Sequence, residues 1–101
     1  MATTINTIWA QVDEIYQNIY SINIDDQFMR NMGIIQQRID SLDKEIYTLG
    51  LSGVAVQQAR AWSCNLRGLI LFVGSEYAFK SDNRLLYERF IQDSLSNYNQ
   101  S

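Results

Sequence analysis

The feature that most constrains the fold is a run of apolar residues between positions 26 and 49, spaced alternately four and three apart. The run consists of Phe28, Met32, Ile35, Ile39, Leu42, Ile46 and Leu49. This heptad spacing keeps one side of an α-helix facing a partner helix over about three repeats. Asp25 or Asp26 is expected to cap the start of this helix, and Gly50 to end it in the left-handed conformation.

Three further segments, residues 3–22, 53–74 and 82–97, show apolar residues at helical spacing. Their candidate N-caps are Thr3 or Thr4, Ser52, and Ser81 or Asp82. The chain contains no proline, so no position excludes a helix. The connections are short, which favours antiparallel neighbours. We therefore predict one all-α domain over residues 1–101, an antiparallel four-helix bundle with helices at about 3–22, 26–49, 53–74 and 82–97.

The stretch LILFV, residues 69–73 between Gly68 and Gly74, allows a second interpretation as a buried strand. A strand needs a partner strand for its backbone groups, and no other segment alternates apolar and polar residues between turn signals. A helix that is apolar on nearly every side and ends near Gly74 is therefore favoured. The alternative is a helix that ends near Gly68 and continues as a short extended segment. The small residues Ala61, Cys64 and Gly68 are expected to let a neighbouring helix come close.

The charge pattern excludes several classes of partner. Lysine and arginine total 8 against 11 acidic residues, giving a net charge of −3, and no basic run is present. Binding to a nucleic-acid backbone requires clustered positive charge, so it is not expected. No apolar run reaches the length of a membrane span, and the N-terminus lacks the pattern of a signal peptide. With a single cysteine, Cys64, the sequence predicts a soluble cytoplasmic protein.

Residues for catalysis or metal binding are sparse. The chain has no histidine, the commonest general base and metal ligand. Cys64 is expected to be a small buried hydrophobe. The carboxylate pairs are assigned to solvated faces: Asp13 with Glu14, Asp25 with Asp26, and Asp40 with Asp43. No catalytic, cofactor or metal site is predicted, and the chain is predicted not to be an enzyme.

Exposed aromatic residues are the more informative signal, because aromatic side chains anchor protein interfaces. The candidate interface residues are Tyr47, Leu71, Phe72, Tyr77 and Phe79. Leu71 or Phe72 is expected to reach either the deepest core or a second subunit. Packing at the ends of the bundle is the alternative for the other three. Both tryptophans, Trp9 and Trp62, are assigned to the core.

Four arginines are candidates for binding an anion. They are Arg60 and Arg67 in the third predicted helix, and Arg84 and Arg89 in the fourth. If antiparallel packing brought the two pairs together, they would form a small pocket for an anion or a nucleotide. Ordinary surface salt bridges are the alternative, with Glu76, Glu88 and Asp93 as partners.

The balance of 47% apolar and 19% charged residues suggests that the chain buries surface against a partner as well as against itself. We expect a small acidic protein-binding module, such as an inhibitor, adaptor or immunity-type protein of the kind that phages and mobile elements encode. One alternative is a homo-oligomeric structural protein that pairs through the heptad run. Another is a sensor or sponge that holds a nucleotide at a subunit interface through the four arginines.

Overall fold

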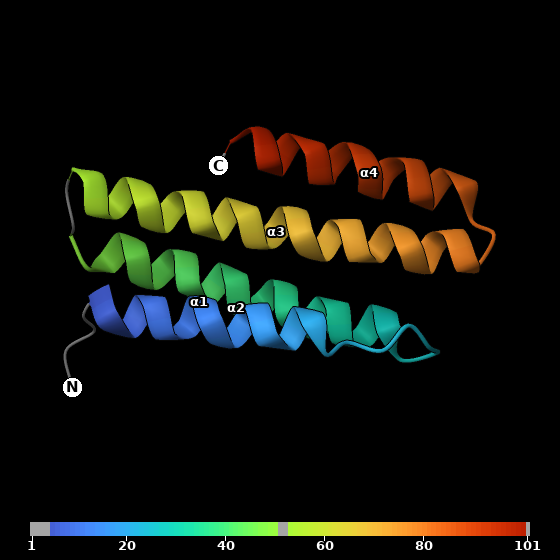
Figure 1. The fold of residues 1–101 in the computed structure, drawn as a ribbon, viewed down its shortest axis with the longest axis horizontal. Coiled ribbons are helices and arrows are strands. Elements are labelled where there is room, and N and C mark those ends of the chain that lie inside the picture. Colours follow the sequence, from blue (N-terminus) through green and yellow to red (C-terminus); the bar gives the residue numbers. More distant parts are fainter. Residues whose placement is uncertain (1–4, 51–52, 101) are drawn as a thin grey trace.

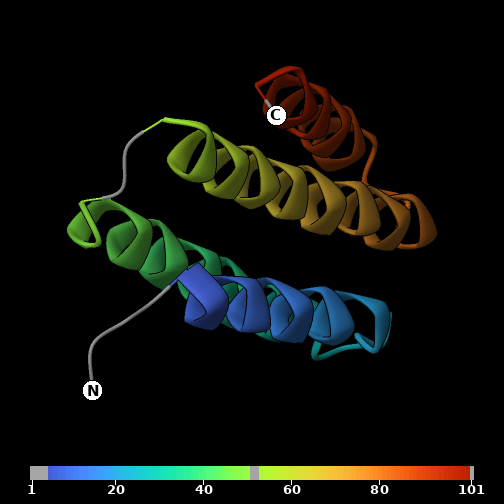
Figure 2. The same cartoon turned by 60° about the vertical axis from the view of Figure 1, so that its left-hand side comes forward.

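The computed structural model describes residues 5–50 and 53–100, and over this part the chain forms four α-helices (Figure 1). They are α1 (Ile5–Tyr20), α2 (Phe28–Thr48), α3 (Val54–Lys80) and α4 (Arg84–Asn99). Successive helices run in opposite directions, which confirms the predicted antiparallel bundle. α3 lies in the middle, with α1 and α2 on one side of it and α4 on the other (Figures 1 and 2).

The core of the bundle is built on the heptad run of α2. Six of its seven members are buried, and Leu49, at the end of the helix, is partly buried. α1 contributes a matching stripe of buried residues, Ile8, Val12, Ile15 and Ile19. The run is therefore covered by α1 and α3 of the same chain.

The stretch LILFV forms helix, as favoured, but α3 does not end at Gly74. It continues to Lys80, and Gly74 lies inside the helix, where side chains of α2 and α4 pack closely against it. A Cβ atom at Gly74 would lie 3.1 Å from Cε of Met32 and from the ring of Phe90. Gly68 has the close-packing role that was predicted, because a Cβ atom there would lie 3.0 Å from the ring of Tyr98.

The helix boundaries differ from the predicted ones by a few residues. Gln27, rather than Asp25 or Asp26, precedes α2, and the Asp25 carboxylate instead accepts a hydrogen bond from the Gln27 amide. Asn83 caps α4 by accepting from the amide of Leu86 at 3.1 Å, in place of Ser81 or Asp82.

Other local predictions were confirmed or fall on residues outside the described ranges. Gly50 has φ of +63°, which confirms its left-handed role at the end of α2. The predicted caps Thr3, Thr4 and Ser52 lie outside the described residues. At Gly33, inside α2, nothing lies within 4 Å of the Cβ position that another residue would have. Within the described ranges, no helix combines the length and apolarity that a bilayer crossing needs.

Candidate interaction surface

α3 has an outer stripe that the other helices cover only in part. Its members follow one another at steps of three and four, so they share one side of the helix. They are Trp62, Asn65, Leu69, Phe72, Glu76 and Phe79, and none of them is fully buried. The exposed fractions are 44% for Trp62, 48% for Phe72 and 74% for Phe79. The helix is apolar on nearly every side, as predicted, but Trp62, Phe72 and Phe79 on this stripe remain exposed.

The C-terminal half of the stripe adjoins α4. The rings of Phe79 and Tyr87 lie 5.9 Å apart at an interplanar angle of 57°. Phe72 and Phe79 line a shallow groove with Tyr87 and Ile91 of α4. We call Trp62, Leu69, Phe72, Phe79 and Tyr87 together the aromatic surface.

Three tyrosines lie close to one another near the middle of the bundle. The hydroxyls of Tyr16 and Tyr20 hydrogen-bond at 3.0 Å, and their rings meet edge to face at 4.8 Å. This hydrogen bond, with smaller effects of burial and of the neighbouring tyrosines, raises the pKa of Tyr16. Burial raises the pKa of Tyr98, and its electrostatic interaction with Tyr20 adds to the shift. Tyr98 packs on Gly68, so this cluster links the C-terminal ends of α1 and α4 across α3.

A second groove lies between α1 and α3 at the N-terminal end of the stripe. It has a volume of about 600 Å³. Its walls are Trp9, Val12, Asp13, Tyr16, Gln58, Ala61 and Trp62. Trp62, assigned to the core from sequence, is exposed and lines this groove instead, whereas Trp9 packs against the core as predicted and also lines the groove.

The five predicted interface residues do not form one surface. Leu71 is buried in the core, which is one of the two positions predicted for it; the other was contact with a second subunit. Tyr77 is partly buried and stacks on Phe28 with ring centroids 4.8 Å apart. Tyr47 is exposed, but it lies near the end of α2, whereas Phe79 lies near the end of α3 at the other end of the bundle (Figure 1). Phe72 and Phe79 belong to the aromatic surface, and sequence reasoning missed Trp62, Leu69 and Tyr87.

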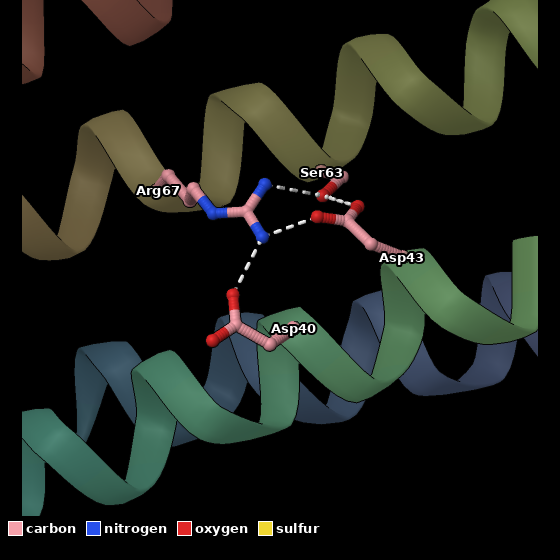
Figure 3. A network of polar contacts seen from close by, with 4 residues as sticks. All are labelled: Asp40, Asp43, Ser63 and Arg67. Atoms are coloured by element: carbon pink, nitrogen blue, oxygen red, sulfur yellow. Dashed lines mark hydrogen bonds and ion pairs between the residues drawn. The ribbon is translucent and has the colours of Figure 1, made fainter.

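The Arg67 guanidinium is occupied by carboxylates of α2 (Figure 3). One of its nitrogens lies 2.8 Å from the Asp40 carboxylate and also pairs with Asp43. The buried hydroxyl of Ser63 donates to Asp43 and accepts from Arg67 at 3.3 Å. Burial disfavours the charged form of Arg67, but the hydrogen bonds to Asp40 and Asp43 outweigh it and raise its pKa. This network joins α3 to α2, so Asp40 and Asp43 are not on a merely solvated face.

The candidate Arg84 lies apart from Arg67. Arg84 pairs with Glu88 on its own helix at 3.2 Å. It lies at the start of α4, beside the end of α3, and about 20 Å of helix separates that end from Arg67. Arg60 and Arg89 are both exposed. The structure thus does not gather the four arginines of one chain into a pocket.

Metal-binding and nucleophilic groups are also dispersed. Among the described residues, no three cysteine, aspartate or glutamate side chains come together as a metal site would require. Cys64 is partly buried in α3. In the predicted pair of Asp13 with Glu14, the Glu14 carboxylate is bound to Arg38 of α2 at 2.5 Å.

Comparison of the chain with protein-family models, curated proteins and solved structures gave no match.

Proposed function

We propose that this chain is a small protein-binding module that acts by occupying a surface of a partner protein. We further propose that it acts as an inhibitor, adaptor or immunity-type protein of the kind that phages and mobile elements encode. Its small size and its net charge of −3 support this proposal. The cytoplasm is the proposed compartment, because Cys64 is free.

The observation that carries the proposal is the aromatic surface. Large apolar side chains left in water cost free energy, and burying one fully returns about 1.5–3 kcal/mol. Phe79 is 74% exposed and Phe72 48%, and they lie two helical turns apart on one stripe. Tryptophan, tyrosine and phenylalanine are enriched at protein interfaces, where they bury a large area at low cost in rotamer entropy. A surface built from Trp62, Phe72, Phe79 and Tyr87 has this composition.

The alternatives have less support from the contacts. A nucleotide sponge needs free cationic groups, and the most buried candidate, Arg67, is bound by two carboxylates. A self-assembling protein based on the heptad run needs that run exposed, and it is buried. A dimer formed through the aromatic surface remains a distinct outcome of the experiment below.

Site-specific photo-crosslinking tests the proposal. A crosslinking amino acid at position 79 would be compared with one at position 85, since Leu85 is also highly exposed but lies outside the aromatic surface. Both variants would be expressed in the cells from which the sequence derives, under reducing conditions. We expect a stoichiometric crosslink to one other protein from position 79 and none from position 85.

A second variant checks that the surface is responsible for the crosslink. Phe72→Ser, combined with the crosslinker at position 79, should greatly reduce the product while the circular dichroism spectrum stays unchanged. Recovery of only the chain's own dimer would replace the proposal by the homo-oligomer alternative. Absence of any stoichiometric product from position 79, or equal products from positions 79 and 85, would overturn it.

A further inference from the structure

The groove between α1 and α3 combines aromatic walls with a single charged group. Trp9, Asp13 and Tyr16 follow one another at steps of four and three, so they project from the same side of α1. Trp62 of α3 forms the opposite wall and is 44% exposed. Among the described residues that line the groove, Asp13 alone is charged.

The Asp13 carboxylate differs from its neighbours in having no cationic partner. Glu14, the next residue, pairs with Arg38, and Asp40 and Asp43 pair with Arg67. Within the described part of the chain, Asp13 takes part in no ion pair. It is exposed, so water solvates it while the groove is open.

The charge decides what can fill the groove favourably. A purely apolar side chain would remove water from Asp13 without replacing it, which costs free energy. An anionic group would be repelled. A cation would pair with Asp13 and could also lie against the faces of Trp9 and Trp62, and tryptophan is the aromatic residue that attracts cations most strongly.

We propose that this groove receives an arginine side chain of the partner protein, with its guanidinium group between the two tryptophans and bound to Asp13. Arginine fits both features, because its planar guanidinium stacks on aromatic rings and pairs with carboxylates through two hydrogen bonds. Its three methylene groups would lie along Val12 and Ala61, which are apolar. The proposal rests on the proposed function and names the chemistry of the partner.

Butylguanidinium, which mimics the end of an arginine side chain, is a suitable probe. Butylurea is its matched control, since it has nearly the same shape without the charge. Both would be titrated to millimolar concentration into the isotope-labelled chain, and the indole N–H resonances of Trp9 and Trp62 followed by NMR. We expect butylguanidinium to shift both resonances along a saturable curve and butylurea to leave them nearly unchanged.

Three variants assign the binding to the groove. Asp13→Asn and Trp62→Leu should each weaken binding by about two- to fivefold or more, the loss expected for one exposed cation–aromatic or ionic contact. Asp93→Asn removes an exposed carboxylate of α4, away from the groove, and should leave binding unchanged. Asp13 and Trp62 are both exposed, so the variants should keep the fold, as circular dichroism would verify.

The proposal is overturned if butylguanidinium shifts neither tryptophan, if butylurea binds as well, or if Asp93→Asn weakens binding as much as Asp13→Asn. Its failure is distinguishable from failure of the proposed function. The crosslink from position 79 depends on Phe72, Phe79 and Tyr87, the part of the aromatic surface that lies away from the groove. A partner captured there without guanidinium binding would leave the protein-binding module standing and remove only the arginine anchor.

Discussion

Two glycines inside helices offer a direct test of how closely the helices pack. Gly33 lies in α2 and Gly74 in α3, and replacing either by alanine adds one methyl group. At Gly33 the new methyl group would meet nothing within 4 Å. At Gly74 it would lie 3.1 Å from Met32 of α2 and from Phe90 of α4, both of which are buried.

The expected magnitudes follow from two terms. Alanine favours a helix interior over glycine by about 1 kcal/mol, and this gain is common to both sites. At Gly74 the methyl group must also displace buried side chains, and overpacking of this kind costs about 1–3 kcal/mol. Gly33→Ala should therefore raise the free energy of unfolding by about 1 kcal/mol. Gly74→Ala should be less stable than Gly33→Ala by about 1–3 kcal/mol.

The assay is denaturation by guanidinium chloride and by heat, followed by far-UV circular dichroism. For a domain of this size, 1 kcal/mol corresponds to about 4–8 °C in Tm. Gly33→Ala should raise Tm by that amount, and Gly74→Ala should leave it unchanged or lower it. Equal rises in both variants would refute the reasoning, because they would mean that α2 and α4 do not approach Gly74 as closely as the structure shows.

Two further predictions concern polar contacts. Asp43→Ala should lower the free energy of unfolding by about 1–3 kcal/mol, because the buried Ser63 hydroxyl loses its acceptor. Asp40→Ala, which removes a more exposed partner of Arg67, should cost less than about 1 kcal/mol, and equal losses in guanidinium denaturation would contradict the network described. The raised pKa of Tyr16 favours its neutral form in the folded state, so its stabilising effect is complete below the unfolded pKa of about 10 and is lost as pH rises through the folded pKa. Tyr16→Phe should therefore reduce the decline of stability that urea denaturation measures as pH rises above about 10, and an unchanged decline would refute this assignment.

The proposed surfaces depend on how α3 is placed. Of the four helices that the structure describes, α3 alone packs against the other three, yet Trp62, Phe72 and Phe79 on its outer stripe stay exposed. α4 lies beside α3 alone, so it covers one side of α3 and leaves Phe72 and Phe79 at its border. The groove with Trp9 and Trp62 lies at the other border, toward α1. A partner laid along α3 could contact both places.

Local patterns in the sequence were sufficient for the helices and for most of the core. Steps of three and four identify one side of a helix wherever a segment carries a single apolar stripe, as in α1 and α2. The same rule was insufficient for α3, which has apolar residues on three sides. Trp62 was assigned to the core because periodicity does not say which of several apolar sides is covered. Gly74 was interpreted as a helix end for a similar reason, since a glycine's local preference carries no information about Met32 and Phe90.

By itself, therefore, the sequence determined an all-α chain with four amphipathic segments, the buried run of α2 and the left-handed end at Gly50. These depend on residues near one another in the chain, where backbone geometry relates spacing directly to direction. The tertiary structure alone decided that Arg67 is bound by Asp40 and Asp43, that α3 continues past Gly74, and that Trp62 lines a groove with Trp9. Each of these features depends on which helices are neighbours and on how far they are shifted along one another's axes. Packing of the whole core sets both.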